Sequence, residues 1–106
     1  MTLKENLKIE YVDINIPRPV SYNPRTDDAE ILKDATESIS RFGIVDPLIL
    51  NSAKNLLNNV IGGHLRLKIA KMLGYSQIPV VYVNIPDPEK EKELNLRLNK
   101  NLGKWD

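Results

Sequence analysis

The stretch Ile61-Gly62-Gly63-His64-Leu65-Arg66-Leu67-Lys68-Ile69-Ala70 decides how the rest of the chain is arranged. An apolar strand end runs into two glycines and then into the opening of a basic helix. Glycine tolerates positive φ and allows the backbone to approach a ligand, and the first turn of a helix presents unpaired N–H groups at the positive end of its dipole. The stretch therefore predicts an anion-binding turn between a strand and a helix.

The distribution of charge favours the same interpretation. The whole chain carries a formal charge of +1, but residues 51–86 contain four basic residues and no Asp or Glu. The glycine turn thus lies in a strongly basic segment, which suits a polyanionic partner.

Length and composition indicate one ordinary globular domain. The chain has 106 residues, of which 27% are charged and 42% apolar, enough for a single core. No apolar run approaches the roughly 20 residues of a membrane span, and residues 1–10 lack the hydrophobic centre of a secretion signal. The absence of cysteine excludes disulfides, thiol catalysis and cysteine-bound zinc, and a single histidine excludes a histidine-rich metal site. We expect a cytoplasmic protein without a metal site or membrane segment, with a flexible N-terminus at 1–7 and one domain at 8–106.

Periodicity and turn residues predict an α+β fold: a small mixed sheet of about four strands with three helices. Pro47 in the second expected strand predicts that this strand enters near an edge of the sheet or that the proline stands among its first residues, because proline cannot donate to the strand ladder. The alternating Glu and Lys residues at 89–93 predict a solvated helix face. The expected strands are 8–16, 44–50, 56–61 and 78–83, and the expected helices are 27–42, 64–73 and the segment that begins at Asp87-Pro88. The expected apolar helix faces are Ile31, Leu32, Ala35, Ile39 and Phe42 in the first helix and Leu65, Ile69, Met72 and Leu73 in the second.

Several side chains near the glycine turn suit phosphate. Arg66 falls at the margin of the apolar face, where its guanidinium either binds an anion or remains a surface group. His64 could donate to phosphate, act as a general acid or base, or serve only near the helix cap. Lys68 and Lys71 share a helix face with His64 and are candidates for nucleic-acid contacts. Asn23-Pro24-Arg25 is either a second anion-contacting loop or an ordinary turn.

The order of four motifs resembles the ParB/sulfiredoxin-like superfamily, also described as ParB-like nuclease domains. The resemblance covers about residues 9–106. The motifs are Asn23-Pro24-Arg25, the segment from Leu32 to Leu48 with Ser38, Gly43 and Pro47, the segment from Gly62 to Gly74, and Ile78-Pro79-Val80. The closing segment 96–106 is most similar to ParB-type domains of phage and mobile-element proteins, including those that precede DNA methyltransferase domains.

This resemblance implies that the glycine-initiated helix holds nucleotide phosphates, as with CTP in chromosome-segregation ParB proteins and ATP in sulfiredoxin. Gly63 and Arg66 match the family's phosphate-binding box. Ser38 falls where relatives have a Ser or Thr that approaches phosphate, and Asn99 falls where they have an Asn that helps to bind a metal-nucleotide. The implied cofactor is a nucleoside triphosphate or diphosphate with Mg. The implied partners are a nucleotide or DNA, together with a second copy of the chain or a downstream DNA-modifying domain.

Departures from the family pattern leave three functional hypotheses. His64 stands where sulfiredoxin has its reactive cysteine, which excludes sulfinic acid repair, and Leu65 and Leu98 stand where relatives carry polar or charged residues. The leading hypothesis is a nucleotide- or DNA-phosphate-binding domain that serves a DNA-transaction protein. The second is a nuclease, NTP hydrolase or phosphotransferase that uses His64 with a carboxylate from Glu30 or Glu37. The third is a non-catalytic interaction module that docks through the last helix and Trp105.

Overall fold

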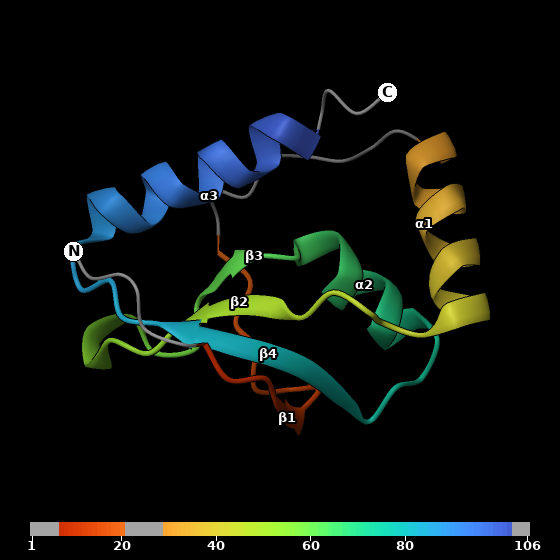
Figure 1. Cartoon of the computed structure of the whole chain (residues 1–106), viewed down its shortest axis with the longest axis horizontal. Helices are drawn as coiled ribbons and strands as arrows, with labels where there is room; N and C mark the ends of the chain where they lie inside the picture. The colour runs from red at the N-terminus through yellow and green to blue at the C-terminus, as the bar shows by residue number, and fades with distance from the viewer. Residues whose placement is uncertain (1–6, 21–28, 103–106) are drawn as a thin grey trace.

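Four strands and three helices form the described part of the chain, as the sequence predicts. The computed structural model describes residues 7–20 and 29–102. The sheet has the strand order β1-β4-β2-β3, in which β2 and β4 run parallel and the other neighbours antiparallel (Figure 1). The elements are β1 (Glu10–Asp13), α1 (Ala29–Phe42), β2 (Leu48–Asn51), the short 3-10 helix η1 (Lys54–Leu56), β3 (Val60–Gly62), α2 (His64–Met72), β4 (Gln77–Val83) and α3 (Pro88–Leu102).

The parallel pairing of β2 with β4 places α2 beside the sheet. Leu48 lies opposite Val80 and Asn51 opposite Val83, so the chain must cross back between the two strands, and α2 lies in that crossover. Strand β2 begins directly after Pro47, so the strand predicted at 44–50 is wrong for residues 44–47, and β2 lies between β4 and β3 and not at an edge. Among the described residues no helix is long and apolar enough to cross a membrane.

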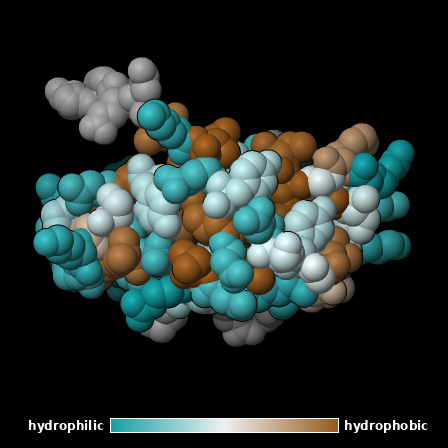
Figure 2. All heavy atoms as spheres, turned by 90° about the horizontal axis from the view of Figure 1, so that it is seen from below, coloured by the Kyte–Doolittle hydropathy of each residue, from teal (hydrophilic) through white to brown (hydrophobic). Residues whose placement is uncertain are grey.

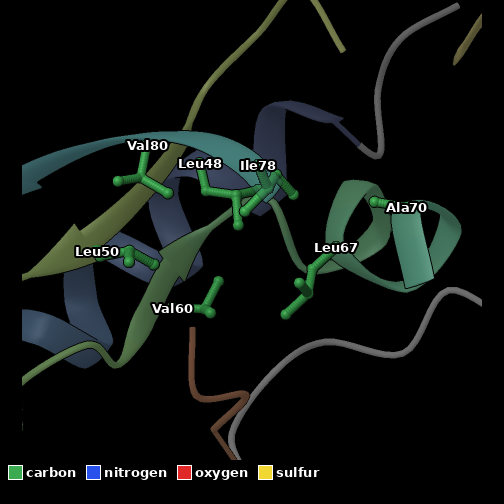
Figure 3. Packing of buried hydrophobic residues seen from close by; sticks show 7 residues of the cluster. All are labelled: Leu48, Leu50, Val60, Leu67, Ala70, Ile78 and Val80. Atoms are coloured by element: carbon green, nitrogen blue, oxygen red, sulfur yellow. The ribbon is translucent and has the colours of Figure 1, made fainter. Parts of the chain in front are cut away.

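The main core lies between α2 and one face of the sheet. Figure 3 shows its seven buried residues, of which two belong to α2 and the others to β2, β3 and β4. Each fully buried Leu, Ile or Val contributes about 1.5–3 kcal/mol relative to an exposed position, so this cluster holds α2, and with it the glycine turn, against the strand ends. The seven residues are Leu48, Leu50, Val60, Leu67, Ala70, Ile78 and Val80.

The segment 14–20 crosses from one edge of the sheet to the other. It leaves β1 at Asp13 and reaches β3, where the Arg18 N–H donates to the Asn58 carbonyl at 2.8 Å and the Val60 N–H donates to the Arg18 carbonyl at 3.0 Å. The continuous strand predicted at 8–16 is therefore wrong beyond Asp13. The strand predicted at 56–61 is also shorter, because Asn58 has a positive φ of 69° and the strand begins only at Val60.

Helix α3 covers the other face of the sheet through polar side chains. Glu91 is 2% exposed, and its carboxylate accepts hydrogen bonds from the side-chain amides of Asn51 (2.7 Å) and Asn59 (3.3 Å). Asn95 is fully buried and donates to the Ile61 carbonyl at 2.9 Å. The solvated face predicted at 89–93 is thus wrong at Glu91. This side chain connects α3 to β2 through Asn51 and to the residue before β3 through Asn59.

Helix α1 packs on α2, at the side of the molecule (Figure 1). Only Ile39 is buried in α1, and Phe42 is 69% exposed although its spacing predicts a core position. In α2, Met72 is 60% exposed, while Leu67 and Ala70 are buried. The face predicted for the first helix is therefore too wide, because α1 packs on another helix and not on the sheet. The face predicted for the second helix is wrong at Met72 and Leu73, which are exposed, and it misses the buried Leu67 and Ala70.

Candidate functional site

The turn between β3 and α2 requires glycine at one of its two glycine positions for conformational reasons. Gly63 is the N-cap residue of α2 with φ of 103°, which is the left-handed region that favours glycine. A Cβ at Gly63 would collide with Leu48 Cδ2 and lie 3.0 Å from Arg66 Nη2. The side chains of Leu48 and Arg66 therefore pack directly against the backbone of Gly63 at the start of the helix. We call this close packing of the three residues the interlock.

Gly62 has a different reason to be glycine. It is buried at the end of β3, and a Cβ there would lie 3.2 Å from Leu98 Cδ1 of α3 and 3.4 Å from Ile49 Cδ1. Its φ is not positive, so of the two glycines only Gly63 uses the positive φ that glycine tolerates. Gly62 allows α3 to pack closely on the sheet, while Gly63 makes the turn.

The first turn of α2 offers unpaired donors. The Leu67 N–H donates to the Gly63 carbonyl at 2.9 Å, so the N–H groups that precede Leu67 lack the acceptor of a regular helix. No side chain of the described residues caps this end. These donors and the helix dipole favour an anion at the turn.

Arg66 lies half-buried at the same turn. Its Nη2 donates to the Pro47 carbonyl at 3.0 Å, while its Nε is buried with no partner among the described residues. Burial lowers the pKa of the guanidinium, and the nearby Asp46 carboxylate opposes that shift. Arg66 thus ties α2 to the start of β2 and retains donors for a ligand.

His64 is neutral and holds one unsatisfied nitrogen. Burial lowers its pKa from 6.5 to about 4. Its Nε2 accepts a long hydrogen bond of 3.5 Å from the Val20 N–H, which assigns the proton of the neutral ring to Nδ1. Nδ1 is buried and has no partner within the described segments. The imidazole therefore presents a hydrogen-bond donor next to the glycine turn.

The structure brings together some of the predicted site residues and leaves others apart. Gly63, His64 and Arg66 share the turn, and Lys68 lies exposed further along α2, as does Lys71. Four other residues singled out in the sequence lie outside α2 in the chain. Ser38 is exposed on α1, Asn99 lies within α3 with a side chain outside the described part, and Arg25 lies in the undescribed segment 21–28, as Trp105 does in 103–106.

The catalytic carboxylate expected from Glu37 does not lie at His64. Glu37 lines an open hollow on α1 together with Leu32, Lys33 and Met72. Met72 is the last residue of α2 and His64 is the first, so their backbones are about 12 Å apart at 1.5 Å per residue. The glycine turn and the Glu37 carboxylate thus belong to opposite ends of the helix.

Two contacts at the site were missed by sequence reasoning. The Asp46 carboxylate interacts electrostatically with the Arg66 guanidinium, and the Val20 N–H donates a hydrogen bond to His64 Nε2. Asp46 precedes Pro47 directly, so the sequence could have placed it at the start of β2. Val20 is 44 residues from His64, and no local pattern joins the two.

Comparison with known proteins places this fold and glycine turn in one family. Residues 2–102 match the family model of the ParB N-terminal domain. The chain is 30% identical over 89 residues to the "ParB-like nuclease domain-containing protein YnaK" of Escherichia coli K12, covering 83% of this chain and 98% of that protein. It is 26% identical over 90 residues to a nucleoid occlusion protein of Geobacillus, covering 84% of this chain and 32% of that protein.

Solved ParB structures have the same fold. ParB of Caulobacter crescentus complexed with CTP-gamma-S aligns with a TM-score of 0.74 at 20% identity, covering 93% of this chain and 55% of that one. The same protein complexed to the centromeric parS site gives 0.70 at 18% identity, covering 92% and 50%. The chain belongs to the ParB N-terminal domain family. It spans nearly all of the Escherichia coli relative, but only about a third of the nucleoid occlusion protein and half of the ParB chain.

Proposed function

We propose that this domain binds the phosphates of a nucleotide or a nucleic acid at the start of α2 and serves a protein of DNA transactions. The observation that carries the proposal is that the first turn of α2 carries several unpaired hydrogen-bond donors. The first N–H groups of α2, His64 Nδ1 and Arg66 Nε all lie there, and within the described residues the two side-chain atoms have no partner. A related structure complexed with CTP-gamma-S and another complexed to parS support this choice of ligand.

The chemistry of these donors suits a phosphate. The helix N–H groups supply several hydrogen bonds and a positive dipole end. The Arg66 guanidinium contributes a full charge with fixed donor geometry, and the neutral His64 contributes a hydrogen bond without a charge. The described segments contain no group of three His, Cys, Asp or Glu side chains that could hold a metal ion, so the magnesium proposed with the nucleotide would be held chiefly by its phosphates.

Further contacts are proposed around this turn. Arg25, in the Asn23-Pro24-Arg25 motif, lies outside the described residues and is proposed as a phosphate contact on the motif alone. Ser38 and Asn99 remain proposed flanking contacts. Lys68 and Lys71, exposed on α2, would contact the backbone of a nucleic acid.

The test is a binding titration of the full chain with CTP, ATP, GTP and a short DNA duplex, each with and without Mg²⁺. Arg66→Lys retains the charge but loses the planar fork, and we expect it to weaken binding by about tenfold, the scale of one charge-assisted hydrogen bond. Lys54→Ala, at an exposed position of η1, is the matched control and should bind as the wild type does. No binding of any ligand, or equal binding by Arg66→Lys, would contradict the site assignment.

The resonance of the single histidine provides a second measurement. A phosphate next to His64 should raise its pKa, because an anion stabilises the charged imidazolium. We expect the NMR titration midpoint of His64 to move upward when a nucleotide is bound. A nucleotide that binds without moving this midpoint binds elsewhere.

A nuclease activity is the second candidate, supported by the name of the Escherichia coli relative. His64 is neutral at pH 7 and can accept a proton, but its pKa of about 4 makes it a weak base compared with the value near 7 that suits general-base catalysis. The geometry therefore favours binding over proton transfer. Metal-dependent DNA cleavage or NTP turnover that disappears in His64→Gln would reverse this preference.

A further inference from the structure

Strand β1 forms an edge of the sheet with unpaired backbone groups. In its antiparallel pairing with β4, Glu10 lies opposite Val80 and Val12 opposite Ile78, and the Ile14 N–H donates to the Ser76 carbonyl at 2.9 Å. Because bonded positions alternate along such a ladder, the N–H and C=O groups of Ile9 and Tyr11 point away from β4. Within residues 7–20 and 29–102 these outward groups have no partner.

The side chains of this edge alternate in character. Leu7, Ile9 and Tyr11 are 57%, 61% and 64% exposed and share one face of the strand. The other face begins with Lys8 and Glu10 and continues with Val12, which packs against the core. The strand pattern in the sequence starts at Lys8, two residues before pairing with β4 starts at Glu10, so the pattern extends beyond the strand that the single chain uses.

The same edge faces outward from the described part of the molecule. β1 lies at the lower border in Figure 1, and Figure 2 looks at the molecule from that side. Apolar surface is exposed at intervals along the middle of this face, and polar side chains occupy its two ends. An uncovered edge strand with an apolar face is a surface for pairing with another strand.

We propose that β1 pairs antiparallel with β1 of a second copy of this chain, in the register centred on Ile9. This register places Lys8 of each copy opposite Glu10 of the other, so two attractive charge pairs form by symmetry. On the opposite face it places Leu7 opposite Tyr11 and Ile9 opposite Ile9, which gives a continuous apolar row. The outward backbone groups of Ile9 and Tyr11 then gain partners.

Neighbouring registers lack this complementarity. A register centred on Glu10 or on Lys8 would place like charges directly opposite one another, and one centred on Tyr11 would place the apolar Ile9 opposite Asp13. Like charges at opposed positions are unfavourable. The second copy is therefore favoured over an unrelated strand, because the sequence of the edge is complementary to itself in one register.

The pairing can be tested by sedimentation equilibrium of the full chain over a wide concentration range, up to about millimolar, where interfaces smaller than about 1,200 Å² become populated. We expect a concentration-dependent dimer. Lys8→Glu and Glu10→Lys should each weaken it by about tenfold, because each replaces two attractive pairs with two repulsive ones. The double variant should restore it. Lys92→Glu, on the exposed surface of α3, carries the same net charge as Lys8→Glu and should leave the dimer unchanged.

A backbone variant tests the hydrogen bonds separately. Ile9→Pro removes an N–H that faces outward while leaving the pairing of β1 with β4 intact, so it should abolish the dimer with the thermal midpoint nearly unchanged. A monomer at every concentration would overturn the proposal. So would a dimer insensitive to Ile9→Pro, or a double charge variant that dimerises no better than the single ones.

Discussion

Replacing Gly63 with alanine tests whether the interlock at the start of α2 holds the fold as well as the site. Gly63 has φ of 103°, and the added methyl group would collide with Leu48 Cδ2 and crowd Arg66 Nη2 at 3.0 Å. Leu48 is fully buried in the core, so moving its side chain would disturb its neighbours in the core cluster. The substitution therefore combines backbone strain with overpacking.

The two effects can be estimated separately. A left-handed backbone costs an L-residue about 1–2 kcal/mol, and overpacking in a filled core costs about 1–3 kcal/mol. Gly63→Ala should thus lower the free energy of unfolding by about 2–5 kcal/mol, a large part of the roughly 5–15 kcal/mol of a typical domain. Gly43 and Gly74, with φ of 80° and 84°, have no described atom within 4 Å of the added Cβ position, so alanine there should cost only the backbone part.

Urea unfolding followed by circular dichroism measures all three variants. We expect the midpoint of Gly63→Ala to fall well below those of Gly43→Ala and Gly74→Ala, which should resemble each other. If Gly63→Ala unfolds at the same urea concentration as these controls, then Leu48 and Arg66 yield easily and the interlock is not rigid.

Three further outcomes are expected. Glu91→Ala should lower the free energy of unfolding by about 2–4 kcal/mol, because it removes a buried acceptor of the Asn51 amide. The exposed Glu93→Ala should lower it by under about 1 kcal/mol. Equal losses of the two variants in urea unfolding would contradict the burial of Glu91. The imidazole of His64 should titrate by NMR with a pKa of about 4. Because the folded state then binds fewer protons than the unfolded state between pH 4 and 6.5, stability should fall as the pH drops through that window, and His64→Gln should flatten the dependence; a midpoint at or above 6.5 would show that the ring is not desolvated. Tyr82→Phe should cost about 1 kcal/mol by removing the 2.7 Å hydrogen bond to Asn58, and an unchanged urea midpoint would show that this bond contributes nothing.

The order of the elements could be predicted because local signals mark each boundary. Pro47, Gly63 and Gly74 each stand where a strand or helix starts or ends, and their backbone preferences act within a few residues. The same local reasoning located the N–H groups at the start of α2. It also identified Arg66 and His64 as candidate phosphate-binding residues. It did not predict which nitrogen of each side chain would be left without a hydrogen-bond partner.

The packing of α3 could not be predicted in the same way, because it depends on polar partners far along the chain. Asn51 is 40 residues from Glu91, and Ile61 is 34 residues from Asn95. The spacing of Glu91, Asn95 and Leu98 follows one helix face, so a buried stripe was visible in principle. Two of its three residues are polar, and polarity was interpreted as exposure.

The proposed binding site uses residues that also join α2 to the sheet, and this limits how much positive charge the site offers to an anion. His64 is neutral, and the Asp46 carboxylate near Arg66 weakens the attraction of the guanidinium for an anion, so a single nucleotide would be held mainly by hydrogen bonds to the turn. Its affinity should depend only weakly on salt. A nucleic acid would also need the exposed Lys68 and Lys71, and each phosphate neutralised in this way adds about 0.9 to the slope of log affinity against log salt for duplex DNA. The salt dependence therefore separates the two ligands: a weak slope that Lys71→Ala leaves unchanged indicates a nucleotide confined to the turn, whereas a steep slope that Lys71→Ala reduces indicates DNA lying along α2.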